Sequence, residues 1–417
     1  MGLTCFCLLT ACGGSDLTSN SNSSSAKKVT ILATITGEGQ KKIEQSLQPF
    51  TEKTGIAISY EGTDAFTTLL PVRVASGNPP DIALFPQPGL MADFAKAGDL
   101  IPLDTVIDAS ELNQAYSQTW QQLGSVHDKL YGLWYRASVK SLVWYNPKAF
   151  AQNGYKVPQT WEELIALSDQ IVAEGKTPWC IGIESGGASG WVGTDWIEDI
   201  VLRMAGTSVY DQWVSHDIPF THPTIKSAFA KFGEIVLNQK YVRGGTVGAI
   251  SIPFGDAATP LFDDPPGCYL HRQASFITEF FPKRVVPGED VDFFVLPPIN
   301  PEFKTPILVS GVVFALFKDT PEARALMAYL ATSEPHEILS GLGDSVSPQQ
   351  QVNLEVYPDE ITRRQAELLL NAEIIRFDGS DLMPGAVGTG TFWSGIVDYI
   401  GGTDLDQVLQ NIDASWE

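Results

Sequence analysis

The sequence predicts an α/β protein built as two lobes, with the chain crossing between them. Its 417 residues suffice for two or three domain-sized cores, and the 44% of hydrophobic and 18% of charged residues are typical of a globular protein. Short apolar runs of strand formers alternate with amphipathic helical stretches, as in sheets covered by helices. Within residues 128–150, two bulky strand-like runs at 133–135 and 142–145 follow each other without a loop of ordinary length. We interpret this stretch as a crossing between lobes; an ordinary core strand filled with aromatic residues is the alternative.

Composition and motifs exclude several classes of function. The chain has 49 acidic and 27 basic residues, and its net charge of −22 repels phosphate backbones, which excludes a general nucleic-acid-binding protein. It contains no Gly-x-Ser-x-Gly elbow, no His-x-x-x-His pair and no Walker loop, so we expect neither a cofactor nor a metal. Its 10 tryptophans offer flat faces that suit stacking on sugars, and they are equally ordinary core residues.

The N-terminal residues resemble a targeting signal followed by a flexible linker. Residues 3–11 form an apolar run that is too short to span a bilayer, and Leu-Thr-Ala ends it directly before Cys12. This pattern resembles the lipobox of bacterial lipoproteins, although the usual basic region is missing. The resemblance implies a signal segment at 1–12 with a lipidated Cys12, whereas an apolar N-terminal strand is the alternative. The Ser- and Asn-rich residues 13–28 have nothing to bury, so we expect a disordered tether and a body held at the outer face of the cytoplasmic membrane or in the periplasm.

The first lobe begins with a βαβ unit. Residues 29–36 and 56–60 read as buried strands around a helix with apolar residues every three or four positions, and such a unit forms a parallel sheet. Ligands of these sheets bind at the carboxyl ends of the strands. Glu38 and Asp64 follow the first two strands, and Gln87 follows a third. We expect these three side chains to contact a ligand; helix-capping or solvated loop positions are the alternative.

The second lobe contains a glycine-rich loop at 184–193, between a strand expected at 179–183 and a helix. We expect this loop to be a flexible rim that carries Trp191 and Trp196 towards a ligand, with Trp191 and Asp195 exposed. The alternative is a tryptophan that plugs the helix against the sheet.

Two later strands carry further candidates. The stretch 268–277 reads as a strand that places His271 and Arg272 inside the lobe, and arginine is seldom buried without a partner. Arg272 can find its partner in carboxylates of its own lobe, as a clamp, or in a ligand. The strand expected at 307–317 has Gly311 at its centre, which indicates close backbone approach.

Three ordered motifs carry a family resemblance. They are Gly-x-x-Pro-Asp-Ile at 77–82, Leu-Val-Trp-Tyr-Asn-Pro at 142–147 and Pro-x-Thr-Trp-Glu-Glu-Leu at 158–164. Together they resemble bacterial extracytoplasmic solute-binding proteins of the maltose-binding type, the sugar-binding subunits of ABC importers, over nearly the whole chain from Lys28. The resemblance implies a two-lobed periplasmic-binding-protein fold of type II, in which each lobe is a sheet flanked by helices.

The resemblance also implies domain bounds and a site. It places lobe 1 at 29–135 and 305–345, lobe 2 at 136–298 and 349–417, and hinges near 132–140, 297–306 and 343–349. The implied ligand contacts are Glu38, Asp64, Gln87, Trp191, Asp195, His271, Arg272, Gly311, Asp378 and Trp393.

Within the family, the motifs around Cys180 and Cys268 resemble the α-glucoside branch, whose members bind α-linked disaccharides or glucosylglycerol-type osmolytes. Both cysteines fall inside these motifs, which favours a disulfide, and two buried free thiols are the alternative.

The function implied is the capture of a sugar or sugar-derived osmolyte by a monomeric protein whose lobes close on the ligand. The protein then delivers the ligand, chemically unchanged, to a membrane permease. Two other classes stay open. One is a secreted glycosidase with two carboxylates drawn from Asp195, Asp256 and Asp378. The other is a structural envelope lipoprotein without a ligand.

Overall fold

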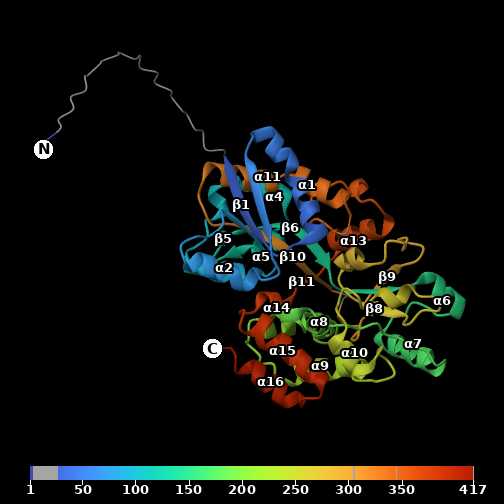
Figure 1. Ribbon diagram of the computed structural model, residues 1–417. Helices are drawn as coiled ribbons and strands as arrows, with labels where there is room; N and C mark the ends of the chain where they lie inside the picture. Colours follow the sequence, from blue (N-terminus) through green and yellow to red (C-terminus); the bar gives the residue numbers. More distant parts are fainter. Residues whose placement is uncertain (3–26, 304–305, 344, 417) are drawn as a thin grey trace.

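Two hydrophobic cores lie one above the other in the computed structural model, which describes residues 1–2, 27–303, 306–343 and 345–416 (Figure 1). We call the elements packed around the core of Leu32, Ile82 and Phe314 lobe 1, and those around the core of Trp196, Phe232 and Ile400 lobe 2. Cys12 and residues 13–26 of the expected tether lie outside the described residues. No helix in the described part of the chain is long and apolar enough to cross a membrane.

The sheet of lobe 1 is mixed. Parallel strands β1 (Lys28–Ala33), β2 (Ala57–Gly62) and β3 (Ile82–Phe85) form one half, with β1 in the middle. The apolar residues of β1 and β3 fill the core, whereas β2, expected to be buried, is an edge strand whose Ile58 and Tyr60 are only partly buried. The remaining strands follow in the order β11-β10-β3, with β6 also paired to β10; they are β6 (Gly132–Val139), β10 (Ile307–Leu316) and β11 (Ile375–Phe377).

Helix α1 (Gly37–Thr54) shows how the sequence sets an element of this lobe. Ile43, Leu47 and Phe50 recur on one face and are buried, and the helix ends at Gly55, whose positive φ of 69° favours glycine. The expected βαβ unit is therefore present. The other helices packed around this sheet are α2 (Phe66–Ala75), α3 (Pro88–Ala97), α4 (Ala109–Ala115), α5 (Gln118–Leu123), α11 (Pro321–Ala331), α12 (Ser333–Gly341) and α13 (Glu360–Asn371).

Lobe 2 is mainly helical around a small antiparallel sheet. Its strands lie in the order β8-β7-β9 and are β7 (Leu142–Tyr145), β8 (Leu270–Arg272) and β9 (Asp292–Val295). The strands expected at 179–183 and 268–277 are shorter than predicted: Trp179 makes only isolated bridges, and a 3-10 turn begins at Ser275. The helices are α6 (Pro147–Asn153), α7 (Trp161–Ala173), α8 (Trp191–Val214), α9 (Pro223–Val236), α10 (Gly245–Ser251), α14 (Gly379–Leu382), α15 (Trp393–Gly401) and α16 (Leu405–Asp413).

The disulfide implied by the resemblance is confirmed. Cys180 and Cys268 are bonded, with their Cα atoms 5.5 Å apart, and they are buried beside Ala258 and Leu261. The bond joins two loops of lobe 2 that are 88 residues apart in the chain.

The chain passes between the lobes at three places. The first lies between β6 and β7, at Lys140 and Ser141, and the second lies between β9 and β10. The third was expected near 343–349, which would put 349–417 on lobe 2. Instead, α13 packs in the core of lobe 1 and β11 pairs in parallel with β10, so residues 349–377 stay with lobe 1 and the chain leaves it at Asp378. The reason is the apolar face of α13, which finds its partners in the first core.

Candidate functional site

Polar side chains of lobe 1 gather at the edge of the sheet that faces lobe 2, where β1, β2 and β3 end (Figure 1). Glu38 lies exposed in the first turn of α1, and the hydrogen bond and charge of Lys41 lower its pKa, with a smaller contribution from Lys283 of lobe 2. Asp64 is exposed just after β2. Gln87 is buried at the residue before α3, and its Oε1 has no hydrogen-bond partner among the described residues. Such a buried acceptor can receive a hydroxyl of a ligand.

An aromatic platform forms the corresponding face of lobe 2. Trp191, the first residue of α8, is half-buried, and its ring centroid lies 5.2 Å from that of Phe254 and 5.9 Å from that of Phe276. The Lys140 ammonium lies 5.5 Å from the same ring. A tryptophan held on three sides in this way keeps its orientation and can stack on an apolar sugar face.

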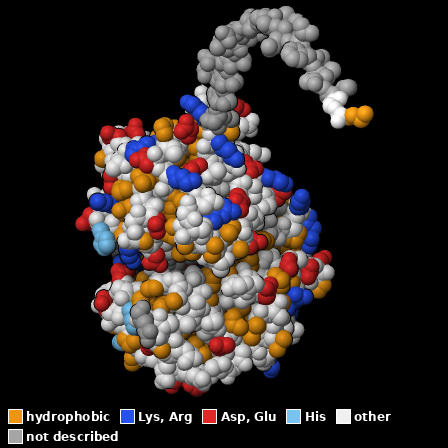
Figure 2. Space-filling model, turned by 60° about the vertical axis from the view of Figure 1, so that its left-hand side comes forward, with side chains coloured by type: hydrophobic (Ala, Val, Ile, Leu, Met, Phe, Trp, Pro, Cys, Tyr) orange, Lys and Arg blue, Asp and Glu red, His pale blue; other side chains and the backbone are white. Residues whose placement is uncertain are grey.

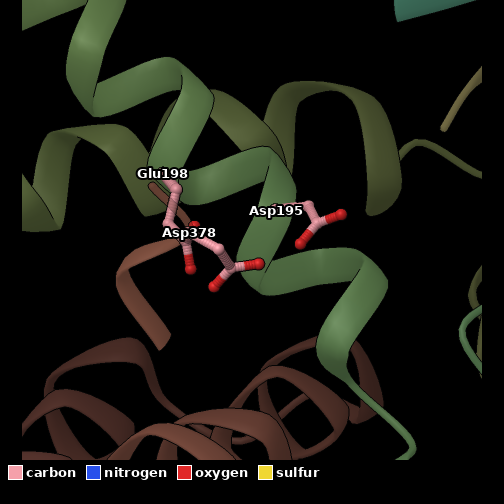
Figure 3. Close-up of side chains that lie close together, drawn as sticks. All are labelled: Asp195, Glu198 and Asp378. Carbon is pink, nitrogen blue, oxygen red and sulfur yellow. The ribbon is translucent and has the colours of Figure 1, made fainter. Parts of the chain in front are cut away.

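Beneath Trp191 lies a buried cluster of charged side chains. Lys140 donates from Nζ to Asp195 at 2.7 Å and to Asp378. In Figure 3, the Asp378 carboxylate lies between the side chains of Glu198 and Asp195, which both come from α8, and all three carboxylates are buried. Glu198 accepts the backbone N–H groups of Gly379 and Ser380, at 2.9 and 3.0 Å. The first and third chain crossings therefore meet helix α8 of lobe 2 at this cluster.

Arginine side chains extend this network deeper into lobe 2. Arg272 donates to Asp199 Oδ2 at 3.1 Å and to the carbonyl of Asp195 at 2.8 Å. Arg203 pairs with Asp199 and donates to the carbonyl of Leu296 at 2.7 Å. Because every one of these groups is buried, each charge depends on its partners for stability.

Burial dominates the protonation of the cluster. It raises the pKa of Asp195 to about 7, against the opposing charge of Lys140, and it raises the pKa of Glu198 well above its usual range. Burial would also raise the pKa of Asp378, but the charge and hydrogen bond of Lys140 overcome it and leave that pKa lowered. Lys140 stays protonated, because Asp195 and Asp378 outweigh the burial that disfavours its charge and raise its pKa. The cluster thus holds protons near neutral pH.

A cation of the protein itself already lies among the three carboxylates. One oxygen each of Asp195, Glu198 and Asp378 lies within 4.8 Å of the others, a spacing that a metal ion could use. The Lys140 ammonium, however, binds two of the three. We therefore read the cluster as an internal ion network.

The structure separates the predicted site residues into two groups. Glu38, Asp64 and Gln87 lie at the lobe 1 edge, and Trp191 lies on the lobe 2 face. Asp195 was expected to be exposed, and this is wrong: it is fully buried because its carboxylate pairs with Lys140.

The remaining predicted residues lie deeper. Arg272 forms the alternative arrangement, a clamp on carboxylates of its own lobe. Buried His271 hydrogen-bonds through Nδ1 to the carbonyl of Cys180, and burial lowers its pKa to about 4, so it is neutral. Asp378 caps α14, and Trp393 is half-buried at the start of α15. Gly311 lies in β10 where an added Cβ would be 2.6 Å from the carbonyl oxygen of Arg136, which confirms the close approach.

Sequence reasoning missed Lys140, Glu198, Phe254 and Phe276. Lys140 had a signal: it is a charged residue within the otherwise apolar or small run Ala-Ser-Val-Lys-Ser-Leu-Val-Trp-Tyr at 137–145. A lysine inside such a run needs a buried partner. Phe254 and Phe276 carried no comparable signal.

Known proteins show what the chain resembles. The family model described as "Bacterial extracellular solute-binding protein" matches residues 33–337. The chain is 58% identical over 409 residues, 98% of this chain and 96% of the relative, to the osmoprotective compounds-binding protein GgtB of Synechocystis. It is 42% identical over 397 residues, 93% of this chain and 87% of the relative, to the alpha-glucosides-binding periplasmic protein AglE of Rhizobium meliloti.

Solved structures share the fold. The bacterial solute receptor AcbH superposes with a TM-score of 0.81 at 20% identity, covering 93% of this chain and 98% of the receptor. Maltose-bound MalE3 of T. maritima superposes with a TM-score of 0.71 at 17% identity, covering 94% of this chain and 99% of that one. These structures confirm the two-lobed fold of the maltose-binding type. The sequence relatives are named for binding, which confirms the expectation of a binding protein rather than an enzyme. The chain belongs to the bacterial extracellular solute-binding protein family.

Proposed function

We propose that this protein captures a sugar-derived osmolyte or α-glucoside between its lobes and delivers it to an ABC permease. What supports the proposal is a half-buried tryptophan, Trp191, on lobe 2 together with polar side chains after the strand ends of lobe 1, among them Gln87 with its unpartnered Oε1. The names of GgtB and AglE support the ligand class, since both relatives match nearly the whole chain.

The chemistry of recognition follows from these groups. The C–H face of a glucosyl unit stacks on Trp191, while hydroxyl groups donate to Glu38, Asp64 and the unpartnered Oε1 of Gln87. Closure removes water from these polar groups, so a ligand that leaves one of them unpaired is rejected. The fully buried Asp195, His271, Arg272 and Asp378 act from beneath by fixing the face that carries Trp191, and Gly311 keeps β6 and β10 close.

The lobe bounds belong to the same proposal. We assign 27–139 and 307–377 to lobe 1, and 141–295 and 378–416 to lobe 2, with the three crossings as the hinge. We also propose that Cys12 is lipidated, that residues 13–28 tether the body to the outer face of the cytoplasmic membrane, and that the protein acts as a monomer. Trp393 is assigned to the rim of the lobe 2 face, where its carbonyl packs against Gly190.

Calorimetry with a panel of small solutes tests the proposal. Glucosylglycerol, sucrose, trehalose and maltose are the candidates, and lactose and glycine betaine are controls without an α-glucosyl group. We expect a saturable heat with at least one candidate and with neither control, and mass spectrometry should recover the ligand intact. Binding of no candidate would refute the ligand class, and cleavage of the ligand would favour a glycosidase.

A further inference from the structure

The two lobes touch through backbone at Gly89. This residue is the second of α3, and a Cβ added to it would lie 2.8 Å from the carbonyl oxygen of Met383, 2.9 Å from that of Asp381 and 3.2 Å from that of Leu382. Its φ lies outside the left-handed region, so the backbone angles do not demand glycine. The lack of space does demand glycine, because backbone carbonyl groups cannot move away from a Cβ atom as a flexible side chain can.

The elements that meet here are anchored in different lobes. Helix α3 buries Met91 and Phe94 in the core of lobe 1. Helix α14 is held by lobe 2, since Glu198 of α8 accepts its first two N–H groups and Met383 lies in the second core. In Figure 1, α14 lies at the boundary between the lobes, and Figure 2 shows the lobes in contact along a boundary across the middle of that face.

The electrostatics of the contact favour it. The carbonyl groups at the end of α14 carry partial negative charge, and they face the first turn of α3, whose free N–H groups carry partial positive charge. The approach therefore costs little as long as residue 89 has no side chain.

We infer that Gly89 is a positioning residue for lobe closure: the α3–α14 contact sets how far the lobes can close around a ligand. The inference rests on the proposed function. The contact begins three residues after Asp378, where the chain leaves lobe 1, so it lies close to the hinge. A small displacement beside a hinge becomes a larger one farther from it, at the proposed ligand contacts Trp191, Glu38 and Asp64. A side chain at position 89 acts as a wedge that holds the binding faces apart.

The test compares Gly89→Ala and Gly89→Val with the control Gly401→Ala. Gly401 is exposed, has ordinary φ, and its added Cβ would meet only one atom, Ile250 Cδ1 at 3.9 Å. Each protein is measured for melting temperature without ligand, for ligand affinity by calorimetry, and for radius of gyration with and without saturating ligand. We expect both Gly89 variants to melt as the control does, to bind with a Kd raised by about tenfold or more, larger for valine, and to compact less on binding.

Three results would overturn the inference. One is affinity and compaction equal to those of Gly401→Ala. Another is weaker binding with wild-type compaction. The third is a ligand-free melting temperature clearly below that of Gly401→Ala, which would assign Gly89 to ordinary packing. If the wild type binds no candidate solute, the proposed function is refuted, whatever Gly89 does. The inference about Gly89 is then refuted if the ligand-free Gly89 variants have the same radius of gyration as the wild type.

Discussion

Lys140 on the first chain crossing binds the carboxylate of Asp378 on the third. The start of β10, directly after the second crossing, joins the same point through backbone: the N–H of Lys140 donates to the carbonyl of Leu308 at 2.7 Å, and the N–H of Asp378 donates to that of Val309 at 2.8 Å. All three connections between the lobes are thus tied to one another, and Asp195 ties them to lobe 2. In the proposed closure, these ties would fix the side of lobe 2 that carries Trp191 while the two lobes move.

Replacing Lys140 by methionine should destabilise the protein strongly. The variant keeps the length of the side chain but leaves Asp195 and Asp378 without their cation, and removing one partner of a buried ion pair costs about 3–5 kcal/mol. Urea denaturation measures the loss. Lys148→Met is the matched control, because Lys148 pairs with Asp290 at 2.7 Å at the surface, and we expect it to cost less than about 1 kcal/mol. Equal stability of the two variants would contradict the ion network.

The stability of the wild type should fall as the pH rises towards neutrality, in part because of Asp195. The pKa of this group is raised to about 7 in the folded protein from an ordinary value of 3.8, so between these values the folded state holds a proton that the unfolded chain has released. Its contribution is complete below the lower value and is lost as the pH passes the upper one. We expect Asp195→Asn, which mimics the protonated acid, to flatten this part of a stability–pH curve, whereas the exposed control Asp93→Asn leaves it unchanged. An identical slope in Asp195→Asn would contradict the assignment.

Local sequence patterns were sufficient to predict many helices and strands, but they did not predict which charged side chains are buried. The spacing of Ile43, Leu47 and Phe50 is a property of the helix itself, so α1 could be predicted from sequence. Asp195 looks the same in a sequence whether it faces solvent or lies beneath Lys140, because its environment is set by residues 55 and 183 positions away. The third crossing was misplaced for a related reason: residues 360–371 alone do not tell which core their apolar face will meet, and in the structure α13 packs in the first core while β11 pairs with β10.

Arg272→Ala should impair folding more than it impairs recognition. Of the two roles expected for Arg272 from sequence, a ligand contact or a clamp on carboxylates of its own lobe, the structure shows the clamp: Arg272 is fully buried, with Nη2 3.1 Å from Oδ2 of Asp199. Asp199 keeps Arg203 and Asp195 keeps Lys140, but the network loses one of its buried cations, and removing one partner of a buried ion pair costs about 3–5 kcal/mol. Circular dichroism on heating measures the effect, and Arg376→Ala, which breaks a surface pair with Asp211, is the control. If the variant kept the wild-type melting temperature but lost its affinity for the ligand, a direct contact between Arg272 and the ligand would be supported instead.

The disulfide should contribute substantially to stability. Cys180 and Cys268 close a loop across 88 positions, and removing such a bond costs about 2–5 kcal/mol, largely because the unfolded chain gains freedom. The double variant Cys180→Ala/Cys268→Ala should melt at a lower temperature than the wild type without reductant. Treating this variant with reductant should change nothing further, and a shift on that treatment would show that other thiols matter.

Trp191→Ala should weaken ligand binding without unfolding the protein. Trp191 is half-buried on the face of lobe 2 and contacts Phe254 and Phe276, so its loss removes the stacking surface while the core of Trp196 and Phe232 stays intact. Removal of a tryptophan at the centre of a binding site costs at least about 2 kcal/mol, roughly thirtyfold in Kd. Trp416→Ala is the matched control, because Trp416 is also half-buried but stacks on His216 in lobe 2 with ring centroids 4.3 Å apart. If calorimetry gave the two variants the same affinity for the solute that the wild type binds, Trp191 would not be the platform, and the ligand would have to bind elsewhere.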